Sequence, residues 1–367
     1  MKILTVVGAR PQFIKAAVVS KVLRTRVQEI LVHTGQHFDY NMSEQFFEEL
    51  DIPKPDYNLG IAGGTHAQMT ARMLVALEAV MVKEKPNMVL VYGDTNSTLA
   101  AALVAAKLLI PICHVEAGTR SVEVGTNRYT LTNPEEVNRT CTDQVSSLLL
   151  ASTQLNMENL RKENLESRSV YVGDPMYDAF LNYREKAEMQ KNTLKTLQGK
   201  IVKLPEKFFY MTCHREENTN DDSVLLNILK VGEQLDELLV YPVHPRNKER
   251  SLRLVEKYNL KNLLLVEPVG YLTSNYMVNH AEKIITDSGG LQREAFFAGV
   301  QCITVLDLVS WPETMVDNRN ILSRPITAEL LEKLNIEQEV DSEYMPFGDG
   351  HAAEKIVNEI TRFLEEK

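Results

Sequence analysis

Short apolar runs alternate along the chain with longer segments in which apolar residues recur every three or four positions. The short runs are typical of buried strands, and the longer segments are typical of amphipathic helices. The strands predicted in the first half of the chain cover residues 2–7, 29–33, 87–92, 112–115, 147–151 and 169–172. One predicted helix between these strands begins near Pro11, and three others cover residues 41–50, 66–83 and 99–109. This alternation predicts an α/β fold with a parallel, doubly wound sheet.

A second series of the same kind follows a polar, lysine-rich stretch at residues 174–203, which carries no strand signal. The strands predicted in this series cover residues 208–213, 238–243, 262–266, 283–286 and 302–305. The helices predicted there cover residues 224–235, 247–258 and 272–281, and an amphipathic helix covers residues 350–366. A length of 367 residues also suits two domains. We expect one domain at residues 1–170, completed by the helix at 350–367, and another at 171–349.

The composition narrows the class of protein. A formal net charge of −10 implies no broad basic surface, which argues against a nucleic-acid partner. The four cysteines are far apart and form no CxxC pair, so neither a zinc site nor a disulfide framework is expected. No apolar run reaches the roughly 18 residues of a membrane span. The first residues lead directly into a strand and not into a signal peptide. We therefore expect a cytoplasmic protein in a reducing environment.

The stretch Ile284-Ile-Thr-Asp-Ser-Gly-Gly-Leu-Gln-Arg-Glu294 predicts a strand, a glycine turn and a new helix. Two glycines let the backbone approach a ligand, and the free N–H groups of a first helical turn attract an anion. We interpret the turn as a phosphate cradle, although a plain strand-to-helix connection would have the same pattern. Neither this turn nor the one after residue 7 matches GxGxxG or a Walker A loop. A dinucleotide dehydrogenase and a P-loop NTPase are therefore disfavoured.

Polar residues with chemical potential follow the predicted strands, where ligands of open α/β sheets bind. The first half supplies Arg10, Gln36, His37, Asp94, Glu116 and the pair Glu135 and Arg139. The second half supplies His214, Arg215, His244, Arg246, Glu267, Ser288, Gly289, Gly290 and Glu294. One set is rich in carboxylates and the other in phosphate-binding groups. If the two sheets face each other across a cleft, this division suits a sugar on a diphosphate leaving group.

Several of these residues also have a structural interpretation. Asn133 suits a helix N-cap, and Glu136 suits the third position of a capping box, which leaves Glu135 available for chemistry. His33 and His114 are expected in or beside the core, and Trp311 is expected to pack. A strand puts His114 and Glu116 on one face, but the sequence supplies no third ligand nearby, so we expect no metal and no other cofactor.

Motifs spread over nearly the whole chain resemble those of the non-hydrolysing UDP-N-acetylglucosamine 2-epimerases. Each motif is weak alone, but the order and the spacing are highly specific. The matching segments are Gly8-Ala-Arg-Pro-Gln-Phe-Ile-Lys15, His33-Thr-Gly-Gln-His37, Gly93-Asp-Thr95, His114-Val-Glu-Ala-Gly118 with Arg120, Pro134-Glu-Glu-Val-Asn-Arg139, His214-Arg215 with Glu217-Asn218, Glu267-Pro268, and Thr286-Asp-Ser-Gly-Gly290 with Glu294.

The resemblance implies a GT-B fold, with the active site between two Rossmann-like domains, and a homodimer. It also implies a reaction in which UDP leaves C1 as the C2 proton is lost, giving a 2-acetamidoglucal, and then adds back with C2 inverted. The catalytic residues it implies are Asp94, Glu116, Glu135 and His214, and which carboxylate is the base stays open. The substrate-binding residues it implies are Arg10, Lys15, Arg139, His244, Glu267, Ser288, Gly289, Gly290 and Glu294. The diphosphate would be held by Arg10, His214, Ser288, Gly289 and Gly290. Glu294 would bind the ribose, and Arg139 would orient Glu135 or contact the sugar.

The resemblance also implies an activator site for a second UDP-sugar, which Gln36, His37 and Arg72 match. The expected substrate is UDP-N-acetylglucosamine, converted to its mannosamine epimer for surface polysaccharide. The chain departs from the family at Leu306-Asp-Leu-Val-Ser-Trp-Pro-Glu313, where arginines are usual, and in the longer stretch at residues 122–132. The segments Tyr92–Leu99, Pro268–Leu272 and Glu294–Phe297 look closer to the branch that acts on UDP-2,3-diacetamido-2,3-dideoxyglucuronate, which is the alternative substrate.

Three other functions stay open. A hydrolysing 2-epimerase would follow the same elimination with water addition and would release UDP. A GT-B glycosyltransferase would need an acceptor and would leave C2 unchanged. A UDP-sugar sensor would bind without turnover. The three acidic residues expected on the sugar side favour proton transfer at C2 over simple glycosyl transfer and over binding without turnover. They do not separate the two kinds of 2-epimerase, which differ in the release of UDP over time.

Overall fold

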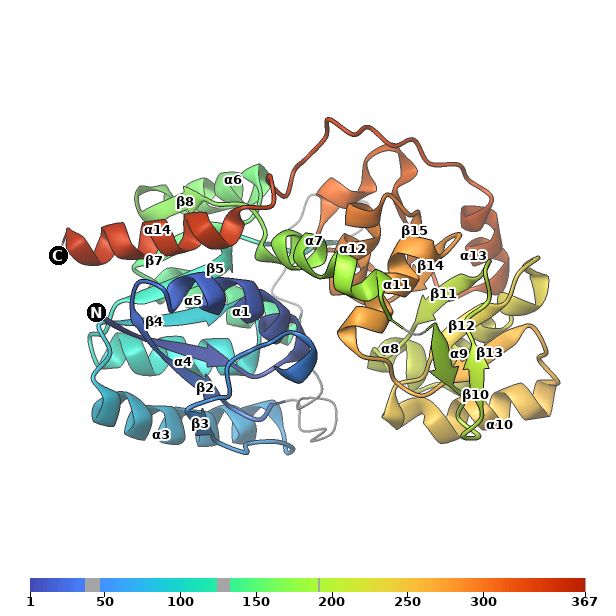
Figure 1. Ribbon diagram of the computed structural model, residues 1–367, viewed down its shortest axis with the longest axis horizontal. Coiled ribbons are helices and arrows are strands. Elements are labelled where there is room, and N and C mark those ends of the chain that lie inside the picture. The colour runs from blue at the N-terminus through green and yellow to red at the C-terminus, as the bar shows by residue number, and fades with distance from the viewer. Residues whose placement is uncertain (37–46, 124–132, 191, 367) are drawn as a thin grey trace. The chain divides into compact units, whose positions relative to one another are not determined.

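The computed structural model describes residues 1–36, 47–123, 133–190 and 192–366, and these residues form two compact units (Figure 1). Unit 1 comprises Met1–Val122, Arg128–Asn182 and Tyr344–Lys367, and unit 2 comprises Glu123–Asn127 and Tyr183–Glu343. The final helix thus belongs to unit 1.

Helix α7, Pro175–Glu188, carries the chain from unit 1 into unit 2. The change falls between Asn182 and Tyr183, later than the position near residue 170 expected from the sequence. The polar composition that begins at Asp174 marks the start of this helix, where the Asp174 carboxylate accepts a hydrogen bond from the backbone N–H of Met176 at 2.9 Å. A change in composition therefore marked a helix start and not a domain boundary.

The sheet of unit 1 is parallel at every described strand pair and has the order β3-β2-β1-β4-β5-β7-β8. The strands are β1 Lys2–Val7, β2 Gln28–His33, β3 Tyr57–Asn58, β4 Met88–Tyr92, β5 Ile112–Ala117, β7 Leu148–Ala151 and β8 Ser169–Tyr171. A further short strand is β6, Val122–Glu123. The direction of sheet growth reverses between β1 and β4, so the carboxyl ends of these two strands diverge into separate connections.

Helices cover both faces of this sheet (Figure 1). They are α1 Arg10–Leu23, α3 His66–Glu84, α4 Asn96–Lys107, α5 Pro134–Val145, α6 Gln154–Lys162, the 3-10 helix η1 Glu166–Arg168, and α14 Ala352–Glu365. Alternate residues of β1 face opposite sides, because side chains of a strand alternate. Leu4 and Val6 join the apolar core under α3 and α4. Thr5 faces the other side and shares the Glu29 carboxylate with Ser20 of α1.

Unit 2 repeats the architecture with a parallel sheet in the order β13-β12-β11-β14-β15-β17. The strands are β11 Phe209–Thr212, β12 Leu239–Pro242, β13 Leu263–Val266, β14 Ile284–Thr286, β15 Cys302–Thr304 and β17 Asn320–Leu322. The helices are α8 Glu216–Thr219, α9 Asp222–Leu229, α10 Lys248–Tyr258, α11 Tyr271–His280, α12 Gly289–Ala298 and α13 Thr327–Leu334, with 3-10 helices η2 Gly232–Gln234, η3 Pro245–Asn247 and η4 Pro312–Asn318. Met211, Tyr241, Ile285 and Ile303 of the sheet pack in one core with Leu225 of α9.

The fold class predicted from the alternation is confirmed, whereas several short elements were missed. The polar stretch at 174–203 contains an antiparallel hairpin, β9 Thr193–Lys195 and β10 Ile201–Lys203. Helices α6 and α13 and strands β16, Leu308–Val309, and β17 were not predicted either. Most of the predicted helix at 41–50 and of the predicted loop at 122–132 lies outside the described residues.

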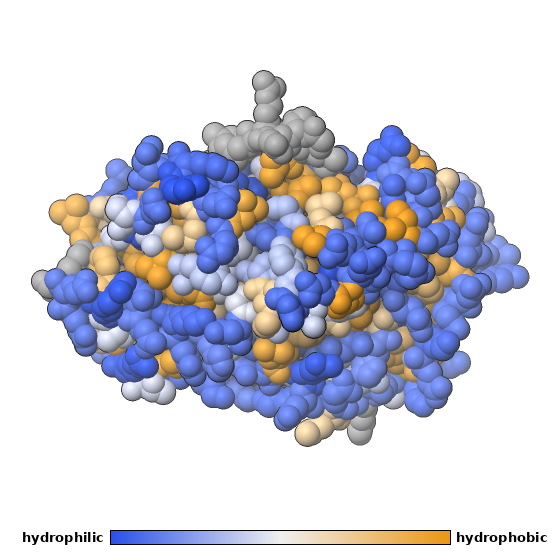
Figure 2. All heavy atoms as spheres, turned by 90° about the horizontal axis from the view of Figure 1, so that it is seen from above, coloured by the Kyte–Doolittle hydropathy of each residue, from blue (hydrophilic) through white to orange (hydrophobic). Residues whose placement is uncertain are grey.

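The face of the molecule drawn in Figure 2 is mostly hydrophilic, with smaller apolar patches between the polar residues. Charged residues make up 25% of the sequence, which agrees with such a surface. Within the described part of the chain, no helix is both long enough and apolar enough to cross a membrane.

Candidate active site

The acidic part of the site lies in unit 1, at the carboxyl ends of β4 and β5. Glu116 is nearly the last residue of β5, at a bulge against β7, and its φ of 71° lies in the left-handed region that favours glycine. Such a conformation costs on the order of 1 kcal/mol or more for a residue with a side chain and often accompanies functional sites. The bulge turns the Glu116 side chain away from the regular alternation of the strand.

Lys15 of α1 contacts the Glu116 carboxylate through its ammonium group. The Lys15 side chain is only 2% exposed, so it is not the solvated lysine that a helix surface usually carries. Glu116 is 5% exposed in the same measure, and the two charges compensate each other in this buried setting.

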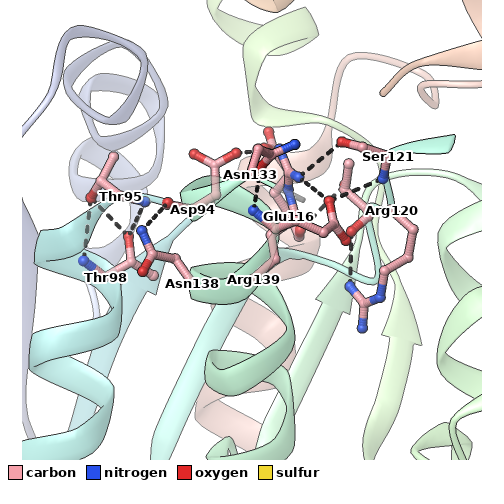
Figure 3. A network of polar contacts seen from close by, with 12 residues as sticks. Asp94, Thr95, Thr98, Glu116, Arg120, Ser121, Asn133, Asn138 and Arg139 are labelled. Carbon is pink, nitrogen blue, oxygen red and sulfur yellow. Dashed lines mark hydrogen bonds and ion pairs between the residues drawn. The ribbon is translucent and has the colours of Figure 1, made fainter. Parts of the chain in front are cut away.

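Arg139 of α5 gathers the remaining carboxylates around itself (Figure 3). Its guanidinium contacts Asp94 through Nη2 and donates to Glu136 Oε2 through Nη1 at 2.6 Å. Burial by itself would lower the pKa of Arg139, but the charges of Asp94, Glu136, Glu116 and Glu135 raise it overall. Asp94 and Glu136 thus contact one buried cation directly, and the charges of Glu116 and Glu135 also act on it.

The first turn of α5 differs in detail from the predicted capping box. Asn133 is the N-cap, and its side chain accepts a hydrogen bond from the Glu136 backbone N–H at 2.7 Å, as expected. The Glu136 carboxylate was expected to return to the Asn133 backbone, but it accepts from the Ser121 N–H at 3.0 Å and from Arg139. Glu136 is fully buried, and a charged arginine compensates it better than a backbone amide would. Glu135 is exposed on the same turn.

Two amides that the sequence did not single out hold this region together. Gln12 Oε1 accepts from the Gly8 N–H at 2.7 Å, and Gln12 Nε2 donates to the Tyr92 carbonyl at 2.7 Å. Asn138 Nδ2 donates to the Asp94 carbonyl at 2.9 Å (Figure 3). Gln12 thus ties the turn before Arg10, the first residue of α1, to the end of β4.

The three residues of the predicted activator site are not brought together by any described contact. Gln36 Oε1 accepts from the Ser97 N–H at 3.1 Å and from the Ser97 hydroxyl at 2.8 Å, so it supports the start of α4. Arg72 is exposed and donates to the carbonyls of Ala62 and Gly63. His37 lies outside the described residues. The activator site stays a prediction.

The residues predicted to bind the diphosphate lie mostly in unit 2, where His214 follows β11 and Asp287 follows β14. Asp287 is fully buried and accepts hydrogen bonds from the backbone N–H of His214 at 2.9 Å and of Arg215 at 2.8 Å. Its Oδ1 also lies 2.9 Å from Nδ1 of the His214 ring. Burial would raise the pKa of Asp287, but the His214 contact and these backbone donors lower it to about 2. Asp287 therefore holds His214 by Nδ1, and Nε2 is the ring nitrogen that this contact does not use.

The glycine turn leads directly into α12. Ser288 is the N-cap of this helix, and its hydroxyl accepts from the Leu291 N–H at 3.4 Å. A Cβ at Gly289 would lie 3.6 Å from Trp311 Nε1, and a Cβ at Gly290 would lie 3.6 Å from the Ser288 hydroxyl, which are ordinary contacts. The chain itself therefore does not require glycine at either position. An external group that approaches the first turn of α12 would require it.

The other predicted residues of unit 2 lie around these two turns. The His244 ring stacks 6.4 Å from the His214 ring. Glu267 pairs with Lys248 at 3.0 Å, a partner that the sequence did not indicate. Glu294 is buried in α12. Trp311 is buried, as expected, and Arg293 stacks on its ring at 4.0 Å. His33 and His114 are also buried, as predicted.

Both units thus carry polar side chains at the carboxyl ends of parallel strands, which is where the ligands of open α/β sheets bind. The sequence model of the family described as UDP-N-acetylglucosamine 2-epimerase matches residues 21–361, and the chain belongs to this family. It is therefore a nucleotide-sugar 2-epimerase, an isomerase with activity of the UDP-N-acetylglucosamine 2-epimerase type.

Individual relatives cover both substrates expected from the sequence. A UDP-N-acetylglucosamine 2-epimerase homolog of Methanococcus maripaludis is 44% identical over 99% of this chain and 100% of its own length. The UDP-2,3-diacetamido-2,3-dideoxy-D-glucuronate 2-epimerase of Pseudomonas aeruginosa is 43% identical over the same shares. The crystal structure of the Methanocaldococcus jannaschii UDP-GlcNAc 2-epimerase in complex with UDP-GlcNAc and UDP superposes with a TM-score of 0.86, at 37% identity over 99% of this chain and 100% of that one.

Proposed function

We propose that the chain inverts C2 of UDP-N-acetylglucosamine by elimination and re-addition of UDP. In the elimination, the C1–O bond breaks and UDP takes the electron pair. The C2 proton passes to a carboxylate, and the C1=C2 double bond of a 2-acetamidoglucal forms. UDP then attacks C1 as a proton returns to the opposite face of C2. The observation that carries the proposal is that Asp94 and Glu116 lie at the carboxyl ends of the neighbouring strands β4 and β5, where Arg139 and Lys15 contact them.

This acidic cluster suits the electronic demand of the elimination. No carbonyl lies next to C2 to acidify its proton, so cleavage at C1 has to run ahead and gives the sugar oxocarbenium character. Carboxylates stabilise such a cation and also accept its proton. Lys15 and Arg139 contact the carboxylates of Glu116 and Asp94 and hold them in place.

The diphosphate would be held by Arg10, by His214 through Nε2, and by the turn at 288–290. Negative charge grows on the leaving UDP as the C1–O bond breaks, so these contacts are stronger in the transition state than in the bound substrate. Glu294 and Glu267 are proposed to bind the nucleoside part of the substrate. His244 is proposed to bind the substrate next to His214.

The sugar is tested by proton NMR in heavy water, with UDP-N-acetylglucosamine and UDP-2,3-diacetamido-2,3-dideoxyglucuronate in separate samples. The proposal predicts deuterium at C2 of the first sugar, together with its 2-epimer and little free UDP. Exchange only in the second sugar would assign the chain to that substrate, which the identity to the Pseudomonas protein favours.

The same spectra separate the rival reactions. Stoichiometric release of UDP with a free 2-epimeric sugar would indicate a hydrolysing enzyme. Binding without exchange in either sugar, also with both present together as activator and substrate, would contradict the epimerase proposal. A transferase would release UDP only in the presence of an acceptor.

We also propose a homodimer, as the family resemblance implies. Support comes from α3, where exposed apolar side chains recur every three or four residues at Ala67, Ala71, Val75, Ala79 and Val82. Light scattering should give the mass of two chains for the wild type and of one chain for Val75→Glu. A monomeric wild type would contradict the proposal.

A further inference from the structure

His114 is a buried histidine in β5, two residues before Glu116, and the mechanism above does not use it. Its ring is fully buried. Nδ1 lies 2.7 Å from Asp143 Oδ1, and Nε2 lies 2.7 Å from the Gly93 carbonyl oxygen. Both ring nitrogens therefore face oxygen atoms at hydrogen-bond distance.

Both partners of the His114 ring act as acceptors. The Gly93 carbonyl has no proton to donate, so Nε2 has to carry one. Asp143 already accepts at Oδ2 from the Gly118 N–H at 3.1 Å and from Arg120 Nη1 at 2.8 Å. Burial would raise the pKa of Asp143, but His114 and Arg120 lower it overall, so the group is a carboxylate and Nδ1 has to donate as well. A neutral imidazole has one N–H and cannot satisfy both oxygens.

The neighbouring charges alternate in sign, and this arrangement stabilises a charged His114 ring. His114 faces Asp143, Asp143 faces Arg120, and Arg120 faces Glu163 through two contacts of 2.7 Å. The two positive and two negative groups balance, and the Glu163 side chain is 24% exposed, so the row reaches solvent. Buried charges are tolerated when they are paired and hydrogen-bonded in this way.

The row fixes the backbone on both sides of the acidic cluster. His114 holds the carbonyl of Gly93, the residue directly before Asp94, and Gly93 has a φ of 61° in the left-handed region. Asp143 holds the N–H of Gly118, two residues after Glu116. The turns that carry the two carboxylates are therefore tied to one ion pair.

We propose that His114 and Asp143 are positioning residues of the epimerase, which act as a buried imidazolium–carboxylate pair to fix Asp94 and Glu116 relative to each other. This inference rests on the proposed function of those two carboxylates. Neither His114 nor Asp143 touches the sugar; both act through the backbone that presents the acids.

The first test reads the charge of the ring directly. Selective ¹⁵N-histidine labelling of the full-length enzyme gives signals from eight imidazole rings. The signal of His114 is identified because it is missing in His114→Gln. In the wild type at pH 7.5, both ring nitrogens of His114 should carry protons. In Asp143→Asn, His114 should change to the one-proton form. A wild-type ring with one unprotonated nitrogen would overturn the imidazolium assignment, and this readout does not depend on activity.

The second test reads positioning in the kinetics. His114→Gln and Asp143→Asn should lower kcat roughly 10²-fold, because a displacement of about 1 Å of a catalytic group costs that much. UDP affinity should stay within about threefold of the wild type, and Asp143→Glu should recover part of kcat. The control is His280→Gln, which removes another imidazole–carboxylate pair, with Glu188 at 2.9 Å, far in sequence from the acids. Its kcat should not change.

Two outcomes separate this inference from the proposed function. If Asp94→Asn and Glu116→Gln are inactive while folded His114→Gln and Asp143→Asn keep a kcat within twofold of the wild type, positioning is wrong and the mechanism stands. If Asp94→Asn and Glu116→Gln are themselves active, the proposed function fails first. Circular dichroism verifies the fold of each variant, and the ring measurement on the wild type decides the inference if a variant does not fold.

Discussion

At the scale of single residues, the acids of the site differ in what holds them. Asp94 and Glu116 are each paired with a buried cation, Arg139 and Lys15, whereas Glu135 is exposed on the first turn of α5. Substitutions of the three acids should therefore differ in their effect on the free energy of unfolding, even where their effects on turnover are similar.

Asp94→Asn, Glu116→Gln and Glu135→Gln should each lower turnover at least 10²-fold, the usual contribution of general acid–base catalysis. Glu116→Gln should also lower the free energy of unfolding by about 3 kcal/mol, because it leaves the buried Lys15 ammonium without its carboxylate. Asp94→Asn should lower it less, because Arg139 keeps its contact with the buried Glu136. Glu135→Gln should leave that free energy unchanged. Initial rates and urea unfolding measure the two effects, and near-normal rates in all three variants would remove the mechanism.

Asp287 links the site to stability through its pKa. The folded pKa of about 2 lies below the ordinary value of 3.8, so Asp287 stabilises the fold by about 2 kcal/mol at pH 7. The sign follows from proton binding. The unfolded chain has the higher pKa, so it takes up the proton first when the pH falls below 3.8, and the stabilisation by Asp287 decreases as the pH falls toward 2. About half of it should be left at pH 3.

The variant Asp287→Asn tests this expectation. The difference in unfolding free energy between wild type and variant should be about 2 kcal/mol at pH 7 and should narrow as the pH falls from 5 to 3. UDP affinity should fall as well, since His214 loses the carboxylate that holds Nδ1. A difference that is independent of pH would show that Asp287 acts by packing alone.

At the scale of helices and strands, the sequence predicted where chemistry would gather, because parallel strands end at a common edge. Asp94 after β4 and Glu116 at the end of β5 could be recognised in this way. The partners could not, because they come from distant positions: Gln12 bonds the Tyr92 carbonyl, and Asp143 bonds His114. No local pattern in the sequence encodes such a pairing.

Short elements were missed for a related reason. Strand β17, Asn320–Leu322, has three residues and begins with a buried asparagine, whose side chain accepts a hydrogen bond from Thr304 at 2.6 Å. Its pairing with β15 stabilises it, and its own sequence has too few apolar residues to signal a strand. Longer strands with continuous apolar runs were predicted nearly to the residue.

The first turn of α12 gives a prediction at this scale. Gly289→Ala should fold normally, because the new Cβ meets only Trp311 at ordinary distance, and alanine favours a helix by about 0.5–1 kcal/mol. The methyl group should nevertheless occupy the space of the diphosphate and weaken UDP binding at least tenfold. The fluorescence of Trp311, the single tryptophan of the sequence, measures both the folding of the variant and its UDP binding.

The control for this variant is Ala298→Gly at the other end of α12, which changes helix propensity and leaves the turn intact. Its UDP affinity should equal that of the wild type. An unchanged UDP affinity in Gly289→Ala would show that the diphosphate binds elsewhere.

At the scale of the whole molecule, the alternation of strands and helices was enough to predict two parallel α/β halves. The chain passes from unit 1 to unit 2 between Asn182 and Tyr183, within α7, and it returns to unit 1 with the final helix. The return of the chain depends on one carboxylate: Asp178 of α7 accepts hydrogen bonds from the backbone N–H of Ala352 at 3.0 Å and of Ala353 at 2.7 Å.

Asp178→Ala should therefore loosen the C-terminal helix. Two buried N–H groups at the start of α14 would lose their acceptor, which costs about 1–2 kcal/mol. The apolar face of α14, with Ile356, Val357 and Ile360 buried, would then release more easily. Hydrogen exchange should show faster exchange in α14 and in α1, which packs against it, with little change in unit 2. The matched control is Asp349→Ala, which removes an exposed acceptor at 3.2 Å from the His351 N–H and an exposed ion pair with Lys355 at 2.8 Å, and should cost less than about 0.5 kcal/mol. Equal effects of the two variants would mean that α14 is held by its apolar face alone.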